Sequence, residues 1–228
     1  MVCGQPLGIL KLTRTPSGAG SIGASMQVMI MTETYEFELH FALPPSQSDA
    51  EAWLDTLFEA GCDDALIGVA VPGRVSVSFT REGEEVMAVL LGAIADVTGA
   101  ISGSVLMSAG PDLLNLTEIA ERLTEHGAPI TRQAMRKYAA GEARRLAAPF
   151  PAPAIAGGTP LWHLDDVLTW MAHEKKLPAL PGVAALRALA GATRALNVVC
   201  EYHRARAESP ALMAAVEEKL QPAYVRHL

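Results

Sequence analysis

The chain has 228 residues, half of them hydrophobic and only 5% aromatic, and its formal net charge is −7 at pH 7. This length suffices for one large domain or two small ones with buried cores. The negative net charge argues against a protein that coats nucleic acid non-specifically. Three widely spaced cysteines, Cys3, Cys62 and Cys200, match no metal or redox spacing and indicate a reducing compartment.

Membrane insertion and secretion are not indicated by the sequence. The most continuous apolar run, Val86–Ile101, is interrupted by Asp96 and is too short to span a bilayer. The N-terminus lacks a signal-peptide core followed by a cleavage site. We therefore expect a cytoplasmic protein without membrane contact.

Residues 1–31 show no periodicity of a strand or a helix, and Pro16–Ser21 is a flexible, low-complexity patch. We expect a disordered leader here, with the natural start at or near Met31; a genuine regulatory tail is the alternative. The letters of a dinucleotide-binding loop occur in Gly18–Gly23. Because no room for a crossover helix follows, we do not expect a nucleotide site.

Residues 32–110 are predicted to form an acidic α+β domain. Apolar and polar residues alternate from Tyr35, which is typical of a half-buried strand. A capping box, Ser48–Glu51, then predicts a helix that ends at Gly61. The apolar stripe of this helix would consist of Trp53, Leu54, Leu57 and Phe58.

The second half of this region predicts a hairpin of residues 65–71 and 74–80, a helix of about 84–98 and a last strand of 104–107. The resulting order, β-α-β-β-α-β, is the split βαβ of the ferredoxin-like fold. Two helices would cover one face of a four-stranded antiparallel sheet. The other face would bind a small ligand, pair with a second subunit, face solvent or be covered by the rest of the chain. Its residues would be Glu36, Glu38, His40, Ser76 and Ser78.

Residues 111–176, after the boundary at Gly110–Pro111, read as a helix-turn-helix. Asn115 and Glu118 form a capping box for its first helix, whose inner side would hold Ile119, Ala120 and Leu123. The link of residues 124–129 is longer than the three or four residues of the simplest motifs. Thr131 would cap the second helix. The inner residues of this second helix would be Ala134, Met135 and Tyr138.

The outer face of the second helix carries the residue types that bind DNA, because Arg and Gln read base edges and Lys reaches phosphates. Between Thr131 and Arg145 there are five basic residues and one acid, whereas residues 1–110 hold four basic residues and thirteen acids. Arg144 and Arg145 follow where backbone phosphates would lie. An ordinary solvated basic face is the alternative. The candidate DNA-binding residues are Thr131, Arg132, Gln133, Arg136, Lys137, Arg144 and Arg145.

A Pro/Gly-rich segment, Phe150–Trp162, predicts a β-ribbon with its tip at Gly157–Gly158, and a helix follows Trp162. This order of elements resembles the MerR-like and excisionase-like winged helix-turn-helix proteins of bacteria and phages. The resemblance covers about 60 residues, a quarter of the chain. It implies binding of double-stranded DNA, with one helix in the major groove.

Residues 177–228 are predicted to contain a linker, a long Ala-rich helix of about 183–208 and a final helix of about 210–220. The long helix carries a short heptad seam, which suits a homodimer, although packing within the same chain explains it equally well. The residues of the seam are Leu186, Leu189, Thr193, Leu196, Cys200 and His203.

No catalytic motif or cluster with metal-ligand spacing is found in the sequence, so we expect no enzyme, no cofactor and no metal. The leading hypothesis is a sequence-specific transcriptional regulator at the nucleoid, with an N-terminal domain that senses a small-molecule effector or assembles subunits. The alternatives are an antitoxin-like or phage-type regulator that grips a partner protein through its acidic half, and an adaptor that binds no DNA.

Overall fold

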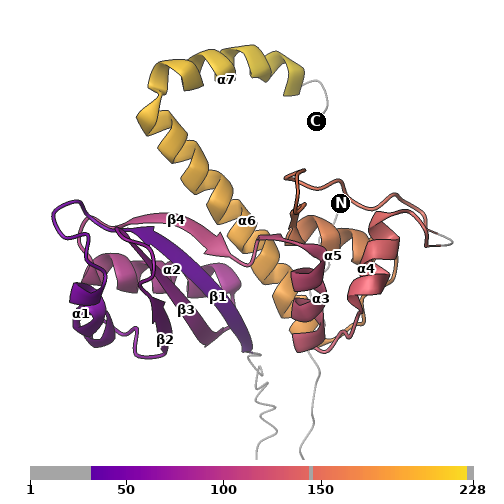
Figure 1. The fold of residues 1–228 in the computed structure, drawn as a ribbon, viewed down its shortest axis with the longest axis horizontal. Helices are drawn as coiled ribbons and strands as arrows, with labels where there is room; N and C mark the ends of the chain where they lie inside the picture. The colour runs from indigo at the N-terminus through magenta and orange to yellow at the C-terminus, as the bar shows by residue number, and fades with distance from the viewer. Residues whose placement is uncertain (1–31, 144–145, 225–228) are drawn as a thin grey trace, which may run out of the picture.

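The computed structural model describes residues 32–143 and 146–224 (Figure 1). Its first part is an α+β unit that begins with a strand and a single 3-10 turn. The elements of this part are β1 (Glu33–Ala42), η1 (Glu51–Trp53), α1 (Leu54–Glu59), β2 (Ala65–Gly68), β3 (Arg74–Gly83), α2 (Val86–Ala100) and β4 (Val105–Gly110). The predicted leader, residues 1–31, lies outside the described residues.

The second part is mostly helical and contains two very short strands that pair with each other. Its elements are β5 (Leu113–Leu114), α3 (Leu116–Glu125), α4 (Arg132–Ala139), β6 (Trp162–His163), α5 (Leu164–His173), α6 (Pro181–Glu208) and α7 (Pro210–Tyr224). The prediction of a mixed α+β chain is therefore confirmed.

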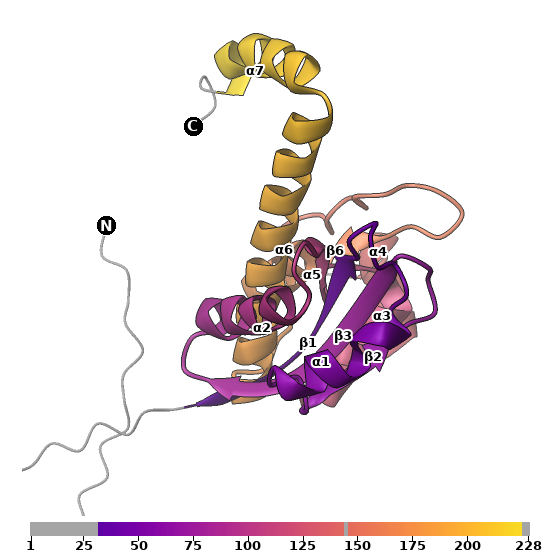
Figure 2. The same ribbon diagram turned by 90° about the vertical axis from the view of Figure 1, so that its left-hand side faces the viewer.

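The four long strands form one antiparallel sheet in the order β2-β3-β1-β4. The predicted alternation along β1 is confirmed, since Tyr35, Phe37, Leu39 and Phe41 are all buried. Phe37 lies opposite Phe79 on β3, with the two rings stacked at 5.4 Å between centroids. Helices α1 and α2 pack on this face through their buried apolar side chains, Leu57, Leu90, Ala93 and Val97 (Figure 2).

The prediction for the first helix was partly wrong. Instead of a capping box from Ser48, Asp49 Oδ1 accepts a hydrogen bond from the Glu51 N–H at 3.1 Å, and the chain enters a 3-10 turn. The α-helix that follows has only six residues. So short a helix buries only Leu57 fully, and Phe58, which was expected to face inward, is 64% exposed.

The central element of the molecule is α6, which belongs to both hydrophobic cores (Figure 1). The first half of α6 lies between the sheet unit and the helical unit. One face of the helix packs into the core of the sheet unit, and another face packs into the core of the helical unit. Residues Ala185, Leu189 and Ala192 join the core of the sheet, whereas Val183, Leu186 and Ala190 join the core of α3–α5. Residues 181–193 are thus part of the folded body.

The predicted heptad seam had two explanations, a homodimer interface and packing within the same chain. For the first half of the seam, the structure shows packing within the chain. Leu186, Leu189 and Thr193 are at most 1% exposed within this single chain. They are therefore unavailable to a second subunit. Only the distal end of the seam, with Cys200 and His203, lies beyond the two cores.

Helix α6 also covers one of the two edges of the sheet, strand β4. The Asn197 side chain forms two hydrogen bonds with the Ala109 backbone, one from the Ala109 N–H at 2.7 Å and one to the Ala109 carbonyl at 2.9 Å. Arg204 donates to the Met107 carbonyl at 3.2 Å. An uncovered edge strand can pair with other chains, so these contacts protect β4.

By length and composition alone, α6 is the one helix among the described residues that could cross a membrane. Core helices of water-soluble proteins have the same length and apolar character. In this fold, the first half of α6 buries seven residues inside the protein, and the second half carries Arg204, Arg206 and Glu201.

Candidate functional site

Helices α3 and α4 begin at the residues that the sequence predicted. Asn115 accepts hydrogen bonds from the Thr117 and Glu118 N–H groups, at 2.8 and 3.1 Å, and Glu118 returns a bond to the Asn115 N–H. Thr131 Oγ1 accepts from the Ala134 N–H at 3.1 Å. Such caps stabilise a helix by about 1 kcal/mol each. They fix where the two helices start relative to each other.

The link between the two helices, residues 126–131, is held as a defined turn despite its length. The Ala128 N–H bonds to the Leu123 carbonyl at 2.8 Å, and Gly127 has a φ of +82°, which favours glycine. Ala128 is buried beside Leu123. The two helices then pack through Ile119, Ala120 and Leu123 of α3 and Met135 of α4, all of them buried.

The outer face of α4 carries four polar side chains that are all exposed. They are the predicted residues Arg132, Gln133, Arg136 and Lys137. Thr131 caps the same helix, so the structure brings five of the seven predicted residues together. The other two, Arg144 and Arg145, lie outside the described residues.

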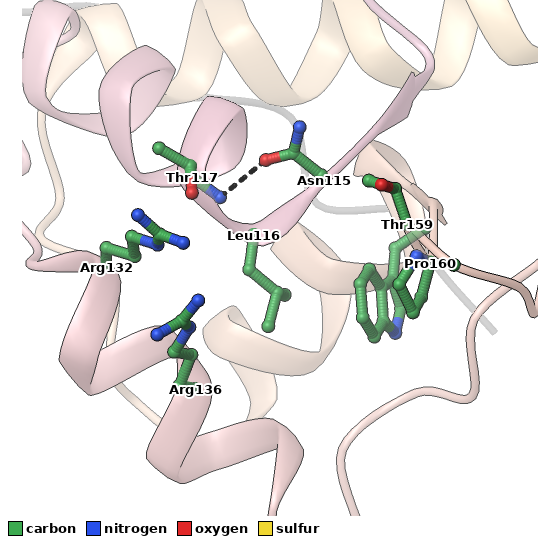
Figure 3. A pocket seen from close by; sticks show the side chains of 9 residues that line it. Asn115, Leu116, Thr117, Arg132, Arg136, Thr159 and Pro160 are labelled. Carbon is green, nitrogen blue, oxygen red and sulfur yellow. Dashed lines mark hydrogen bonds between the residues drawn. The ribbon is translucent and has the colours of Figure 1, made fainter.

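Two of these side chains, Arg132 and Arg136, line a hollow of about 410 Å³ between three segments. Figure 3 shows both guanidinium groups directed from α4 toward the first turn of α3, with the proline-rich segment before β6 on the far side. The spacing of four residues places both arginines on one face of α4. The other lining residues are Asn115, Leu116, Thr117, Gly158, Thr159, Pro160 and Trp162.

The charges around this hollow favour an anion. Among the described residues, neither Arg132 nor Arg136 has a carboxylate within salt-bridge distance. The first turn of α3 also borders the hollow, with its Thr117 and Glu118 N–H groups already bonded to Asn115 Oδ1. The acid nearest in sequence, Glu118, directs its carboxylate to the Asn115 N–H at 2.8 Å. The hollow therefore suits a phosphate oxygen or a similar acceptor.

The predicted β-ribbon of residues 150–162 is much reduced. Its two arms meet at a single pair, Ile155 and Leu161, which exchange two hydrogen bonds of 3.1 and 3.0 Å. Trp162–His163 pairs instead with β5, which the sequence did not predict. Prolines at 151, 153 and 160 have no N–H to donate, so a longer ladder cannot form.

The base of this segment, hereafter the wing (residues 150–161), is anchored by aromatic residues. Trp162 donates its indole N–H to the Pro151 carbonyl at 3.0 Å, and Trp170 donates to the Ala148 carbonyl at 3.1 Å. The Phe150 ring packs edge-on against Trp170, 4.9 Å between centroids. The wing thus leaves the body at a fixed point beside the hollow.

Glu174, at the end of α5, holds the chain that follows α4. Its carboxylate accepts hydrogen bonds from the N–H groups of Ala147 and Ala148 at 2.9–3.1 Å, and only 3% of its side chain is exposed. The bond from Ala147, followed by those from Ala148 and His173, holds the pKa of Glu174 below its ordinary value of 4.5. The ionised form is therefore the one that supports the fold.

We expect Glu174→Gln to destabilise the protein at neutral pH, with a difference from wild type that shrinks as the solution becomes acidic. A carboxyl whose pKa is lowered by folding contributes stability above its ordinary pKa and loses that contribution as pH falls through the folded value. Thermal unfolding between about pH 7 and pH 3 measures the effect. Glu121→Gln, at an exposed position of α3, is the matched control. A difference between Glu174→Gln and wild type that does not change with pH would contradict the assignment.

A polar joint connects the sheet, the helical unit and α6, and sequence reasoning missed it. The Asp112 carboxylate, 7% exposed, accepts from Asn197 Nδ2 at 2.7 Å and lies 2.7 Å from His163 Nδ1. Thr193 donates to the Pro111 carbonyl at 2.7 Å. Asp112 and Asn197 are 85 residues apart in sequence, so no local pattern indicated this contact.

Other charged clusters are accounted for by structure. Arg81 lies over the Phe79 ring and pairs with Asp64 at 2.9 Å and with Asp96 at 2.7 Å. Asp165 and Asp166, predicted as favourable acids of a first helical turn, also pair with Arg194 of α6. Among the described residues, no group of three or more His, Cys, Asp or Glu is arranged to hold a metal ion.

Comparison of the chain with protein-family models, curated proteins and solved structures finds no match.

Proposed function

We propose that this protein is a sequence-specific regulator of transcription that binds double-stranded DNA through α4. One observation carries the proposal: α4 exposes Arg132, Gln133, Arg136 and Lys137 on one side. Two of these residues border an anion-suited hollow between the start of α3 and the wing. A helix that enters the major groove needs such a face, and flanking segments that reach the backbone complete the contact.

In this proposal the helical unit is a winged helix-turn-helix and the sheet unit is ferredoxin-like. The order α3, α4, wing and α5 supports the first assignment. The antiparallel order β2-β3-β1-β4, with helices after β1 and β3, supports the second. The protein would then act in the cytoplasm, at the nucleoid, and the sheet unit would receive an effector or a partner.

The acidic composition of the chain affects its non-specific affinity for DNA and is compatible with specific binding by α4. The face of α4 is locally basic, whereas most acids belong to the sheet unit, where residues 1–110 hold thirteen of the 25 Asp and Glu. Repulsion between those acids and DNA lowers non-specific binding at physiological salt, where the Debye length is only about 8 Å. Recognition would then depend on close contacts by α4 and the wing.

The experiment is selection of bound fragments from a pool of genomic DNA with the full-length protein, followed by titration of the selected fragment at several salt concentrations. With about four phosphate contacts, we expect affinity to fall roughly 100-fold when salt rises fourfold. Absence of any enriched fragment at low salt would overturn the proposal.

A second candidate function is suggested by the sheet unit. Its open face carries Glu36, Glu38 and His40, and among the described residues Glu36 has one distant pairing, with Arg122 at 3.9 Å. This acidic face suits a basic partner protein, as in an antitoxin-like or phage-type regulator. In an adaptor, partner binding would be the whole function. Co-purification of a basic partner with no DNA enrichment would favour the adaptor.

A further inference from the structure

The end of the chain forms an arm that projects from the folded body. Both views show α6 leaving the sheet and the helical unit, with α7 turning back at its far end (Figures 1 and 2). Among the described residues, neither hydrophobic core includes any residue of α7. We refer to Val198–Leu220 as the arm.

The corner of the arm is fixed by a polar network. The Tyr202 hydroxyl donates to Glu217 of α7 at 2.7 Å, and Arg206 donates to the Tyr202 oxygen at 2.6 Å. Arg206 also lies 3.5 Å from the Glu217 carboxylate. The angle between α6 and α7 is thus set by contacts within the chain, so the arm presents a defined surface.

That surface is apolar, and none of the residues that the structure describes covers it. Of the fifteen large hydrophobic side chains that are exposed among the described residues, six lie on the arm, each 38–64% exposed. On α7 they recur every four residues and so form one stripe along the helix. An isolated helix of this length is marginal in water, so α7 needs something to pack against. The six residues are Val198, Val199, Tyr202, Leu212, Val216 and Leu220.

We propose that the arm is a homodimerisation surface, and that the arm of a second copy of this chain covers the apolar stripe. The first argument is charge. The arm holds four acids and three basic residues, whereas the whole chain carries −7. Two copies would repel each other through their acidic sheet units but not through their arms. The charged residues of the arm are Glu201, Glu208, Glu217, Glu218, Arg204, Arg206 and Lys219.

The second argument is size and symmetry. The arm exposes six large apolar side chains, and its 23 residues, from 198 to 220, are the upper limit of what each copy can contribute, against about 20–30 residues per side in a standard interface. In a twofold-symmetric dimer, the apolar stripe of one copy packs against the same stripe of the other copy. Two arms, each with its angle between α6 and α7 fixed, can pack as a small helical bundle. Its centre would hold the six apolar side chains of each copy. This proposal does not depend on DNA binding.

The test is the mass of the full-length protein in solution by light scattering after size exclusion. We expect twice the chain mass of 24.1 kDa for wild type. The double variant Leu212→Lys/Val216→Lys should elute as a single chain, because it places two charges in the apolar stripe. Leu66→Lys, at a 79% exposed position of β2, is the matched control and should remain a dimer.

Hydrogen exchange separates loss of the interface from loss of the fold. In the double variant, amides of α7 should lose protection whereas those of β1 and α3 keep theirs. A wild-type mass of one chain would overturn the proposal, as would a double variant that keeps its fold and stays dimeric.

Discussion

Replacing both Arg132 and Arg136 by Ala is expected to reduce affinity for the selected DNA at least about 30-fold, because each well-placed Arg contact contributes about 1–3 kcal/mol. The two side chains lie on one face of α4 and share the hollow beside α3. Neither has a carboxylate partner among the described residues, so their removal leaves no buried charge behind. The double substitution is therefore expected to leave stability nearly unchanged, so that the decrease in affinity reports on DNA contact.

The same variant should lose its preference for the selected sequence over random DNA. Side chains that read base edges set specificity, whereas contacts to phosphates strengthen binding to all sequences alike. Lys137→Ala is accordingly expected to weaken both kinds of DNA by a similar factor. Fluorescence anisotropy with the two DNAs at one salt concentration measures both affinities.

Arg74→Ala is the control for a single loss of charge, since Arg74 is exposed on β3 in the sheet unit. It should leave affinity within about twofold of wild type, because its charge is screened over distances beyond about 8–10 Å. Undiminished binding by the Arg132/Arg136 double variant would contradict the assignment of α4 as the recognition helix. An equal loss on selected and random DNA would assign the pair to phosphate contact.

The parts of the fold that were predictable from sequence are those in which a local pattern determines the structure. The alternation from Tyr35 to Phe41 identified the buried face of β1 because side chains of a strand alternate between its two faces. Asn115, Glu118 and Thr131 marked the starts of α3 and α4 because their side chains satisfy backbone groups only a few residues away. The exposed face of α4 followed from the same helical periodicity.

Features that depend on distant contacts were not predictable. The apolar residues of α6 fit a dimer seam as well as an internal helix, and only the packing of Leu186 and Leu189 into two different cores decides between them. The wing was predicted too long because the loss of ladder bonds at its prolines was not counted. The Ser48 box failed for a local reason, because the Asp49 carboxylate accepts from the Glu51 N–H and stabilises a 3-10 turn instead.

The polar joint is the clearest case of a long-range feature, and it gives the largest expected effect on stability. We expect Asp112→Ala to lower the free energy of unfolding by roughly 2–3 kcal/mol. The substitution removes the acceptor of two 2.7 Å contacts, from His163 and from Asn197. For a chain of this size, such a change corresponds to a decrease in Tm of about 5–10 °C.

The expected cost is moderate rather than extreme because neither partner is left entirely without contacts. Asn197 keeps its bonds to the Ala109 backbone, and the His163 side chain is 25% exposed and can reach water. Thermal unfolding followed by circular dichroism measures the change, and Asp63→Ala, at an exposed position, is the control. A Tm within about 1 °C of wild type would show that the joint contributes little to stability.

A double-mutant cycle isolates the contact between Asp112 and Asn197 of α6. Asn197→Ala also removes the two bonds to the edge of β4, so by itself it reports on more than the joint. The coupling between Asp112→Ala and Asn197→Ala cancels that additional loss and is expected to be about 0.5–1.5 kcal/mol. A coupling near zero would mean that the contact between Asp112 and Asn197 adds nothing to the other bonds of the joint, those of Thr193 with Pro111 and of Asn197 with Ala109.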